Sequence, residues 1–218
     1  MQSSEDKPIC PVAVADGEMG ERARKKLEQL IEGARQVFLE KGFGGASVDD
    51  IAREAGISKA TMYRYFPDKS AIFNEIVRRD FKRHADMMEQ GSVDLPLEEL
   101  LRAHARKHVR LLTSPFMQGM FRAAVAESAR VPEYGINFFE SGPDKGRRWL
   151  APVLRAAAER GEISVPDANA AAYQFFALCS AEVFYKSLFG VVKHYSEEEL
   201  DEKADMAVRA FLKAYSVE

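Results

Sequence analysis

A short segment in the first third of the chain concentrates residues that can make specific polar contacts with a partner. In AGISKATMYRYFPDKSAIF, residues 55 to 73, six hydrogen-bonding side chains fall within eight positions, and Lys69 follows them. They are Ser58, Lys59, Thr61, Tyr63, Arg64 and Tyr65. A helix between Gly56 and Pro67 has room for about three turns, which is too short for stability in isolation. We therefore expect neighbouring helices to stabilise this helix and its outer face to bind a partner.

These residue types suit recognition of double-stranded DNA. The free amides and the dipole at a helix N-terminus favour a phosphate, and Ser58 and Lys59 stand there. The two tyrosines offer hydroxyls to phosphates and rings to thymine methyl groups, and Arg64 can reach a guanine edge or a phosphate. Lys69 is predicted to contact the DNA backbone beyond the helix. The alternative is a three-helix packing unit whose outer face is ordinary amphipathic surface.

The helices that must position this segment can be traced from their start and stop signals. Residues 22–42 place apolar side chains at spacings of three and four, which predicts a helix that ends near Gly42. Ser47 then caps a short helix, with Asp50 three residues later in the pattern of a capping box. Gly56 ends that helix and provides the tight turn of a helix-turn-helix.

The segment itself is predicted to be the second helix of that pair. Ser58 caps it, it runs to about Tyr65, and Pro67 ends it because the residue before a proline avoids helical angles. Asp68 caps a fourth, longer helix. Two apolar residues of the segment are expected to face inward: Met62 and Phe66.

The rest of the chain also has helical periodicity, so the predicted fold class is all-α. We expect an N-terminal three-helix, helix-turn-helix DNA-binding domain followed by an α-helical ligand-binding and dimerisation bundle. The predicted division is a disordered segment at 1–20, the DNA-binding domain at 21–68 and the bundle at 69–218. The longer helices are expected near 96–113, 116–130, 133–161 with a break at Gly142-Pro143, 167–191 and 197–215.

Composition and charge agree with this division. The 218-residue chain is 46% hydrophobic and 30% charged, with a net charge of −3, which is typical of a globular protein with a buried core. Residues 21–83 have a net charge of +4, whereas residues 84–218 have −4, so a nucleic-acid footprint would lie at one end. The absence of a long apolar run or a secretory signal predicts no membrane contact. Two cysteines predict a reducing, cytoplasmic location.

The segment SVDDIAREAGISKATMYRYFPDKSAIFNEIV resembles the DNA-binding domain of the TetR/AcrR family of bacterial transcriptional regulators. The resemblance covers roughly residues 25 to 80 and includes the IA-x-x-AG stretch and the Ser-x-x-Thr-x-Tyr-x-Tyr-Phe pattern. It implies that the following residues contact DNA: Ser47, Ser58, Lys59, Ala60, Thr61, Tyr63, Arg64, Tyr65 and Lys69. Ala60 departs from the glycine that many members have, so base preference at that turn is open.

The same resemblance implies a homodimer and an effector cavity. Family members dimerise through their last two long helices, which here implies Phe175, Leu178, Leu188, Ala204, Ala207 and Phe211. From about Pro132 to Phe189 the sequence resembles the AefR-like subclass of C-terminal domains, which bind small, apolar molecules. Candidate cavity residues are His108, Met117, Met120, Phe121, Phe138, Trp149, Phe175, Phe176 and Phe184; the alternative for each is ordinary core.

Other motifs do not support an enzyme, a metal site or a cofactor site. His104 and His108 are four residues apart but lack the glutamate of the HExxH arrangement. GFGGAS at 42 to 47 lacks the Lys-Ser/Thr of a phosphate-binding loop, and no nucleophile, base and orienting group share a recognisable spacing. We therefore predict no catalytic residue, no metal and no cofactor.

The sequence predicts a ligand-responsive repressor that a small molecule releases from operator DNA. Two alternatives remain open at this point. One is a small-molecule-binding or catalytic helical protein that does not regulate genes. The other is an architectural DNA-binding protein without a ligand.

Overall fold

The computed structural model describes residues 20–89 and 95–217, and all regular secondary structure in that part is helical. The all-α prediction is confirmed. The predicted disordered lead-in at 1–20 falls almost wholly on residues outside the described part. The helices are α1 Glu21–Gly45, α2 Val48–Glu54, α3 Lys59–Tyr65, α4 Lys69–Glu89, α5 Leu97–Thr113, α6 Pro115–Ser128, α7 Glu133–Ser141, α8 Pro143–Glu159, α9 Ala168–Ser180, α10 Val183–Leu188 and α11 Glu197–Ala214.

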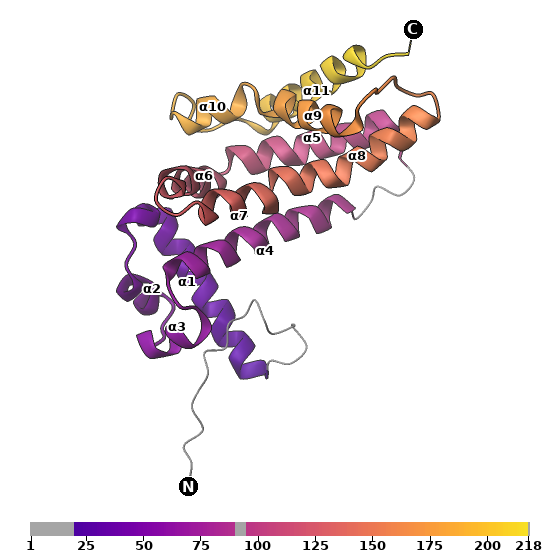
Figure 1. Cartoon of the computed structure of the whole chain (residues 1–218). Helices are drawn as coiled ribbons and strands as arrows, with labels where there is room; N and C mark the ends of the chain where they lie inside the picture. The colour runs from indigo at the N-terminus through magenta and orange to yellow at the C-terminus, as the bar shows by residue number, and fades with distance from the viewer. Residues whose placement is uncertain (1–19, 90–94, 218) are drawn as a thin grey trace.

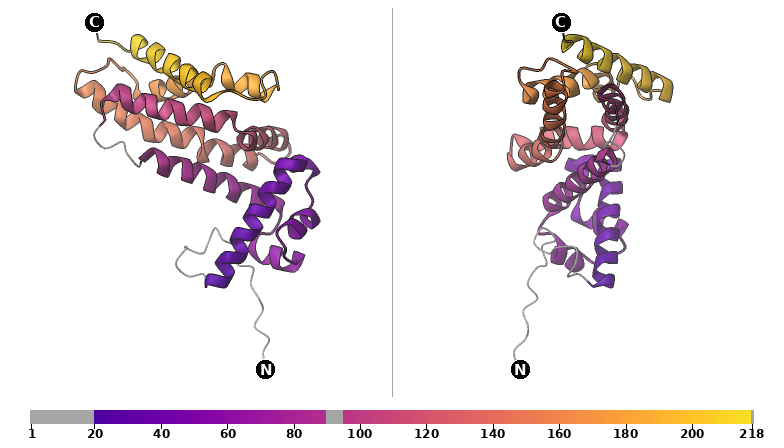
Figure 2. Two further views of the ribbon diagram at one scale, coloured as in Figure 1. Left: turned by 180° about the vertical axis from the view of Figure 1, so that it is seen from behind. Right: turned by 90° about the vertical axis from the view of Figure 1, so that its right-hand side faces the viewer.

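The first three helices form a small unit at one end of an elongated molecule (Figure 1). Helix α4 leaves this unit and runs along the lower face of the bundle formed by α5 to α11. Helices α9, α10 and α11 lie on the side of the bundle farthest from α1–α3, and the views from behind and from the side agree (Figure 2). The bundle thus separates the surface of α3 from the surface of α11.

The helix-turn-helix forms where the sequence predicts it. Ser47 and Asp50 make a reciprocal capping box at the start of α2, and Gly56 adopts the positive φ of +64° that the turn requires. Helices α1 and α2 approach closely, since a Cβ added at Gly33 would lie 2.7 Å from the amide nitrogen of Ala55. The short α3 is held from inside by two fully buried residues, Met62 and Phe66.

Two predicted helix boundaries have different outcomes. The break at Gly142-Pro143 is confirmed, because α7 ends at Ser141 and Pro143 opens α8. The single helix predicted for 167–191 is wrong, because the chain breaks after Ser180 and α10 begins at Val183. Glu182 lies at the break and pairs with Lys186 and Lys203, which fixes the turn against α11.

Two hydrophobic cores run through the molecule. The first joins α1–α4 to α6 and α7, and its members include Phe43, Phe73, Met117 and Tyr134. The second joins α5, α8, α9 and α11, and Leu101, Leu154, Phe175 and Phe211 are among its fully buried members. Helices α6 and α7 therefore pack with the helix-turn-helix unit, although they follow α5 in the chain.

Candidate nucleic-acid interface and ligand cavity

Helix α3 presents a polar face to solvent. Tyr63 is 47% exposed, and Lys59, Ala60 and Arg64 are also exposed. Ser58 caps the helix, because its hydroxyl oxygen accepts a hydrogen bond of 3.1 Å from the amide of Thr61 and lies 2.8 Å from the Thr61 hydroxyl. The hydroxyls of Ser58 and Thr61 therefore bond to each other within the cap. Tyr63 and Arg64 project outward from the last turn.

Two of the predicted DNA contacts, Tyr65 and Lys69, are structural in this fold. The Tyr65 side chain is buried, and its hydroxyl donates a 3.0 Å hydrogen bond to the carbonyl of Ala23 on α1. The Lys69 ammonium donates to the carbonyls of Phe43 and Ala46 at 2.9 and 3.0 Å. These carbonyls end α1 and have no helical partner, so a cation there is favourable. The sequence motif contains both residues, but it does not reveal that their side chains point to backbone carbonyls within the unit.

Ser47 and Lys59 also have partners inside the unit. The Ser47 hydroxyl donates to Asp50 at 2.7 Å, and the Lys59 ammonium pairs with Asp49 on α2. Hydrogen bonds from Lys41, Ser47 and Arg53 hold the pKa of Asp50 well below its usual range. Asp50 is therefore ionised at any physiological pH, and the start of α2 stays capped.

Four basic residues lie close to α3, and none of them is among the predicted DNA contacts. The Tyr65–Ala23 hydrogen bond brings the end of α3 to the first turn of α1. Exposed cations flank that turn in the RARKK run: Arg22, Arg24, Lys25 and Lys26. The signal available in the sequence was the local net charge, which showed where the cations were but not that they would adjoin α3.

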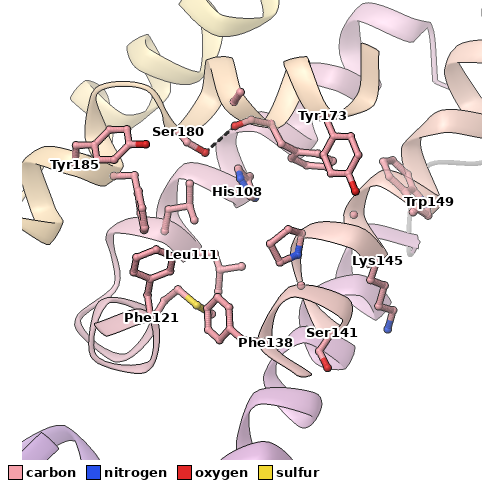
Figure 3. A pocket seen from close by; sticks show the side chains of 18 residues that line it. His108, Leu111, Phe121, Phe138, Ser141, Lys145, Trp149, Tyr173, Ser180 and Tyr185 are labelled. Carbon is pink, nitrogen blue, oxygen red and sulfur yellow. Dashed lines mark hydrogen bonds between the residues drawn. The ribbon is translucent and has the colours of Figure 1, made fainter. Parts of the chain in front are cut away.

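A cavity of about 420 Å³ lies in the bundle, between the two hydrophobic cores (Figure 3). Met117 and Phe138 in its wall belong to the first core, whereas Trp149 and Phe176 pack on the second. The full wall comprises His108, Leu111, Leu112, Met117, Phe121, Phe138, Ser141, Gly142, Pro143, Lys145, Gly146, Trp149, Tyr173, Phe176, Ala177, Ser180, Phe184 and Tyr185. Helices α5 to α10 all contribute to it.

Seven of the nine predicted cavity residues lie in the wall: His108, Met117, Phe121, Phe138, Trp149, Phe176 and Phe184. Met120 and Phe175 do not, because each points from the opposite side of its helix into a core and is buried there. Tyr173 and Tyr185 were missed. Both are exposed at the rim, and their sequence positions carry no signal that distinguishes them from surface residues.

The cavity is aromatic and contains few polar groups. Eight wall residues have aromatic rings, and the Phe121 ring meets Phe138 and Phe184 edge to face, with centroids 5.8 and 4.8 Å apart. The Ser180 hydroxyl donates a 2.7 Å hydrogen bond to the carbonyl of Phe176, and Tyr185 stands at the rim, whereas the amine of Lys145 and the hydroxyl of Ser141 turn outward (Figure 3). No carboxylate is among the wall residues. Such a lining suits a neutral aromatic molecule with hydroxyl groups.

A buried histidine supports the wall from behind. The His104 ring stacks on Trp149 with centroids 4.0 Å apart, and its Nδ1 lies 2.7 Å from the carbonyl of Leu100. Burial lowers the pKa of His104 to about 4, so the ring is neutral at pH 7. His104 is thus a packing residue; it does not line the cavity.

Helix α6 contacts the helix-turn-helix unit through Arg35 on α1; this unit, α1–α3 with the packed start of α4, is called the recognition unit below. The Arg35 guanidinium makes two hydrogen bonds of 2.6 and 2.5 Å to Asp80 on α4. It also lies 4.2 Å from the centre of the Phe116 ring on α6, a distance typical of a cation–π contact. Phe116 immediately precedes Met117 in the cavity wall.

Helix α7 makes a second contact with the same unit. The Tyr134 ring packs edge to face on Phe43 of α1 and Phe73 of α4, with centroids 5.2 and 5.6 Å apart. The Tyr134 hydroxyl also donates to the hydroxyl of Ser70. Phe138, one turn further along α7, lies in the cavity wall. Both helices that grip the recognition unit therefore also line the cavity.

Most of the predicted dimer contacts face the wrong way for an interface. Phe175, Ala204, Ala207 and Phe211 are at most 5% exposed and belong to the second core of their own chain. The stripe that mixes small and large residues is the inward stripe of α11. Leu178 is 40% exposed and Leu188 is half-buried, so these two stay candidates. Met206, 48% exposed, lies on the outer face of α11.

A helix-turn-helix joined to a helical bundle is typical of a class of proteins, the all-helical regulators of transcription. Within this class, the family model for bacterial regulatory proteins of the TetR family matches residues 30–76. The model for the C-terminal domain of AefR-like transcriptional repressors matches residues 99–217. The chain belongs to the TetR family of transcriptional regulators and has an AefR-like C-terminal domain.

Individual relatives agree with this assignment. The transcriptional regulator UidR of Escherichia coli is 26% identical over 196 residues, which cover 87% of this chain and 91% of UidR. A TetR-family regulator from Mesorhizobium loti is 29% identical with a TM-score of 0.81, covering 91% of this chain and all of the other. The flavonoid-responsive regulator FrrA is 32% identical with a TM-score of 0.69, covering 88% of this chain and 98% of FrrA.

The family consists of transcriptional regulators rather than enzymes, which confirms the prediction of a non-enzyme. Within residues 20–89 and 95–217, no cluster of three or more His, Cys, Asp or Glu side chains could hold a metal ion. No helix in the same ranges is long and apolar enough to cross a membrane.

Proposed function

We propose that this regulator is a homodimeric repressor that a neutral, hydroxylated aromatic molecule releases from operator DNA. The observation on which the proposal rests is the position of the cavity. It lies between the two cores, and two of its wall helices, α6 and α7, also grip the recognition unit. A molecule that fills it acts on both cores at once.

Operator recognition is assigned to the exposed end of α3. Tyr63 and Arg64 are the exposed polar side chains without an internal hydrogen bond among those described for α3, and they suit contacts with base edges and phosphates. Ser58, Thr61, Ser47 and Lys59 can add phosphate contacts around the helix start. Arg22, Arg24, Lys25 and Lys26 would contact the flanking backbone, which makes affinity depend on salt.

The proposed ligand class follows from the cavity wall. A volume of about 420 Å³ falls in the range of small-molecule sites, roughly 300 to 1,000 Å³. Aromatic rings favour a flat aromatic body. The Ser180 oxygen, which can still accept a hydrogen bond, and the Tyr185 hydroxyl at the rim favour ligand hydroxyl groups. The relative FrrA responds to flavonoids, which are molecules of this kind, and we extend that ligand class to the present chain.

Release of DNA would pass through α6 and α7. Ligand contacts with Met117, Phe121 and Phe138 would shift these helices, and Phe116 and Tyr134 would transmit the shift to α1 and α4. The recognition helices of the two protomers would then no longer match successive major grooves. The ligand acts as an inducer because it binds this conformation more tightly than the DNA-competent one.

The proposed dimer uses the outer faces of α9 and α11, where Leu178 and Met206 are exposed. A symmetric dimer presents two copies of α3 to two half-sites about one helical turn apart. Each protomer then adds its own contacts to the total binding free energy.

The test is a fluorescence-anisotropy titration with the DNA upstream of the protein's own gene, at several salt concentrations. Specific binding should exceed binding to unrelated DNA by about three orders of magnitude or more and weaken as salt rises. The flavonoid naringenin, added to the complex, should release the DNA. Ser180→Phe, which places a ring in the cavity, should keep operator affinity and abolish release; Ser216→Phe, at the exposed C-terminal end, is the matched control.

Each alternative function predicts a different result. Specific binding that no aromatic compound reverses would support an architectural DNA-binding protein. Naringenin binding without preference for the upstream DNA, or for any sequence selected from a random library, would support a ligand-binding protein that does not regulate genes.

A further inference from the structure

The mouth of the cavity lies on an exposed face of α9 and α10. Four wall residues are exposed to solvent, and three of them come from these two helices: Tyr173, Ala177 and Tyr185. Tyr173 is 40% and Tyr185 is 56% exposed. Large aromatic side chains thus stand half in solvent at the rim, and the cavity is open on this side of the isolated chain.

The exposed face of α9 continues onto α11. The Tyr215 hydroxyl donates to Gln174, and Lys203 pairs with Glu182 at 2.7 Å, so the two antiparallel helices lie edge to edge. Leu178 on α9 and Met206 on α11 are exposed beside this seam. The rim tyrosines and the outer face of α11 therefore belong to one continuous surface.

The charges on α11 are complementary to a second copy of the same helix. Glu199, Glu202, Met206, Arg209 and Lys213 follow one exposed face, acidic before the methionine and basic after it. In an antiparallel pair crossing at Met206, Glu202 meets Arg209 of the partner subunit and Glu199 meets Lys213 of the partner subunit. Within the described part of the chain, Glu202, Arg209 and Lys213 have no salt bridge of their own.

We propose that the effector site is completed by the partner subunit, which covers the mouth at Tyr173, Ala177 and Tyr185 when α11 pairs with its copy at Met206. This inference rests on the proposed homodimer and adds that the cavity is closed only in the dimer. By linkage, a ligand that binds the closed cavity more tightly must also strengthen dimerisation by the same factor per site. Effector binding and assembly are then one equilibrium.

Trp149 makes the closure measurable without a ligand. It is the only tryptophan of the chain and lies in the cavity wall, so acrylamide quenching of its fluorescence reports solvent access to the cavity. The experiment compares the full-length protein with Arg209→Glu, Met206→Glu, the exchange Glu202→Arg/Arg209→Glu, and the control Arg155→Glu. Arg155 is exposed on α8 and outside the cavity wall. Sedimentation velocity gives the oligomeric state of each sample.

We expect Arg209→Glu to weaken dimerisation about tenfold, because a two-fold interface contains the affected pair twice. Met206→Glu should weaken it further. In both variants quenching of Trp149 should rise and naringenin affinity should fall about tenfold. The charge exchange should restore the dimer, the low quenching and the affinity, and Arg155→Glu should match the unaltered protein.

Three results would overturn the inference. Quenching and naringenin affinity could be the same in monomer and dimer, which would leave the repressor function intact. The dimer could persist in both Arg209→Glu and Met206→Glu, which would exclude this pairing of α11. The unaltered protein could be monomeric at the concentrations at which it binds its operator, and the homodimer itself would then be rejected.

Discussion

The two hydrophobic cores of this regulator differ in what they hold together. The first core joins helices that are separated in the chain, because α1–α4 pack with α6 and α7 and α5 lies between them in sequence. Ion pairs cross it, among them Arg35 with Asp80 and Arg79 with Glu28. The second core joins α5, α8, α9 and α11. Its ion pairs, among them Arg102 with Asp205 and Arg110 with Asp201, join α5 to α11 along one edge of the bundle. The ion pairs of the first core hold α1 against α4, whereas those of the second hold α11 against α5 within the bundle.

The position of the cavity relative to the two cores decides which helices the proposed effector would contact. A ligand buried wholly in the second core would meet only the bundle, and one in the first core would compete with the packing of the recognition unit. The cavity lies between them, so a ligand bound there would contact residues of both. Because packed cores resist continuous deformation, any resulting shift of the helices is expected to be a switch between discrete arrangements.

The largest effect is expected from removing the exposed α3 side chains that are proposed to contact DNA. Tyr63→Ala combined with Arg64→Ala should weaken operator binding by about a thousandfold, because two lost contacts of about 1 kcal/mol each occur in both half-sites. Both side chains are exposed, so the free energy of unfolding should stay within about 0.5 kcal/mol of the unaltered protein. Anisotropy titration and urea unfolding measure the two quantities. Unchanged operator affinity would show that α3 is not the recognition helix.

The recognition unit and the cavity wall differ in how well the sequence predicts them. The recognition unit depends on local signals, such as the Ser47 cap, the Gly56 turn and the inward Met62 and Phe66, so its helices were predicted correctly. The cavity wall draws on six helices, and whether a ring lines it depends on how those helices rotate. Periodicity cannot fix that rotation, which is why Met120 and Phe175 were misplaced.

The orientation of polar side chains was the other limit. Tyr65 and Lys69 stand in a motif whose other members are predicted to face DNA, but their partners are the carbonyls of Ala23 and Phe43 on α1 and of Ala46 at its end. These contacts span more than twenty residues of sequence and depend on the packing of α1 against α3 and α4. A single sequence does not reveal which carbonyls a long side chain will reach.

The next largest effect should come from the part-buried ion pair that joins α1 to α4 beside the first core. Asp80→Ala leaves Arg35 half-buried without its bidentate partner, and we expect the free energy of unfolding to fall by about 3 kcal/mol. Glu32→Ala is the matched control, because Glu32 also approaches Arg35, at 3.6 Å, but is exposed; its effect should be below about 0.5 kcal/mol. Equal effects of the two substitutions in urea unfolding would contradict the structural role of the Arg35–Asp80 pair.

A pH titration tests the second core through His104. Burial lowers the pKa of His104 to about 4 in the folded chain, below the ordinary value near 6.5. As the pH falls, the unfolded chain therefore binds the proton first, and the folded state loses stability between about pH 6.5 and pH 4. The loss attributable to this residue should be roughly 2 to 3 kcal/mol.

The comparison for that titration is His104→Phe, which keeps a ring against Trp149. Its stability should depend less on pH across the same interval, with the difference from the unaltered protein largest near pH 4. His194, which is exposed on the loop before α11, provides the control substitution His194→Phe, and the unaltered pH dependence should persist there. A flat profile in the unaltered protein would contradict the burial of a neutral His104.

A smaller loss of stability is expected when the hydrogen bonds of Lys69 to the carbonyls at the end of α1 are removed. Lys69→Met keeps the length of the side chain but removes the hydrogen bonds to the carbonyls of Phe43 and Ala46, and the free energy of unfolding should fall by about 2 kcal/mol. Operator affinity of the folded fraction should be almost unchanged at low temperature. A strong loss of affinity without a loss of stability would return Lys69 to the DNA interface.

The smallest effects separate two tyrosines that stand two positions apart on α3. Tyr65→Phe removes a hydroxyl that donates to Ala23 inside the first core, so it should cost about 1 kcal/mol of stability and leave operator affinity unchanged. Tyr63→Phe removes an exposed hydroxyl, so stability should be unchanged while operator affinity falls about tenfold over the two half-sites. Because the two changes are chemically identical, any difference between them comes from the side of the helix on which each hydroxyl lies. If both variants lost affinity and neither lost stability, Tyr65 would face DNA in solution, and the packing of α3 against α1 described here would be wrong.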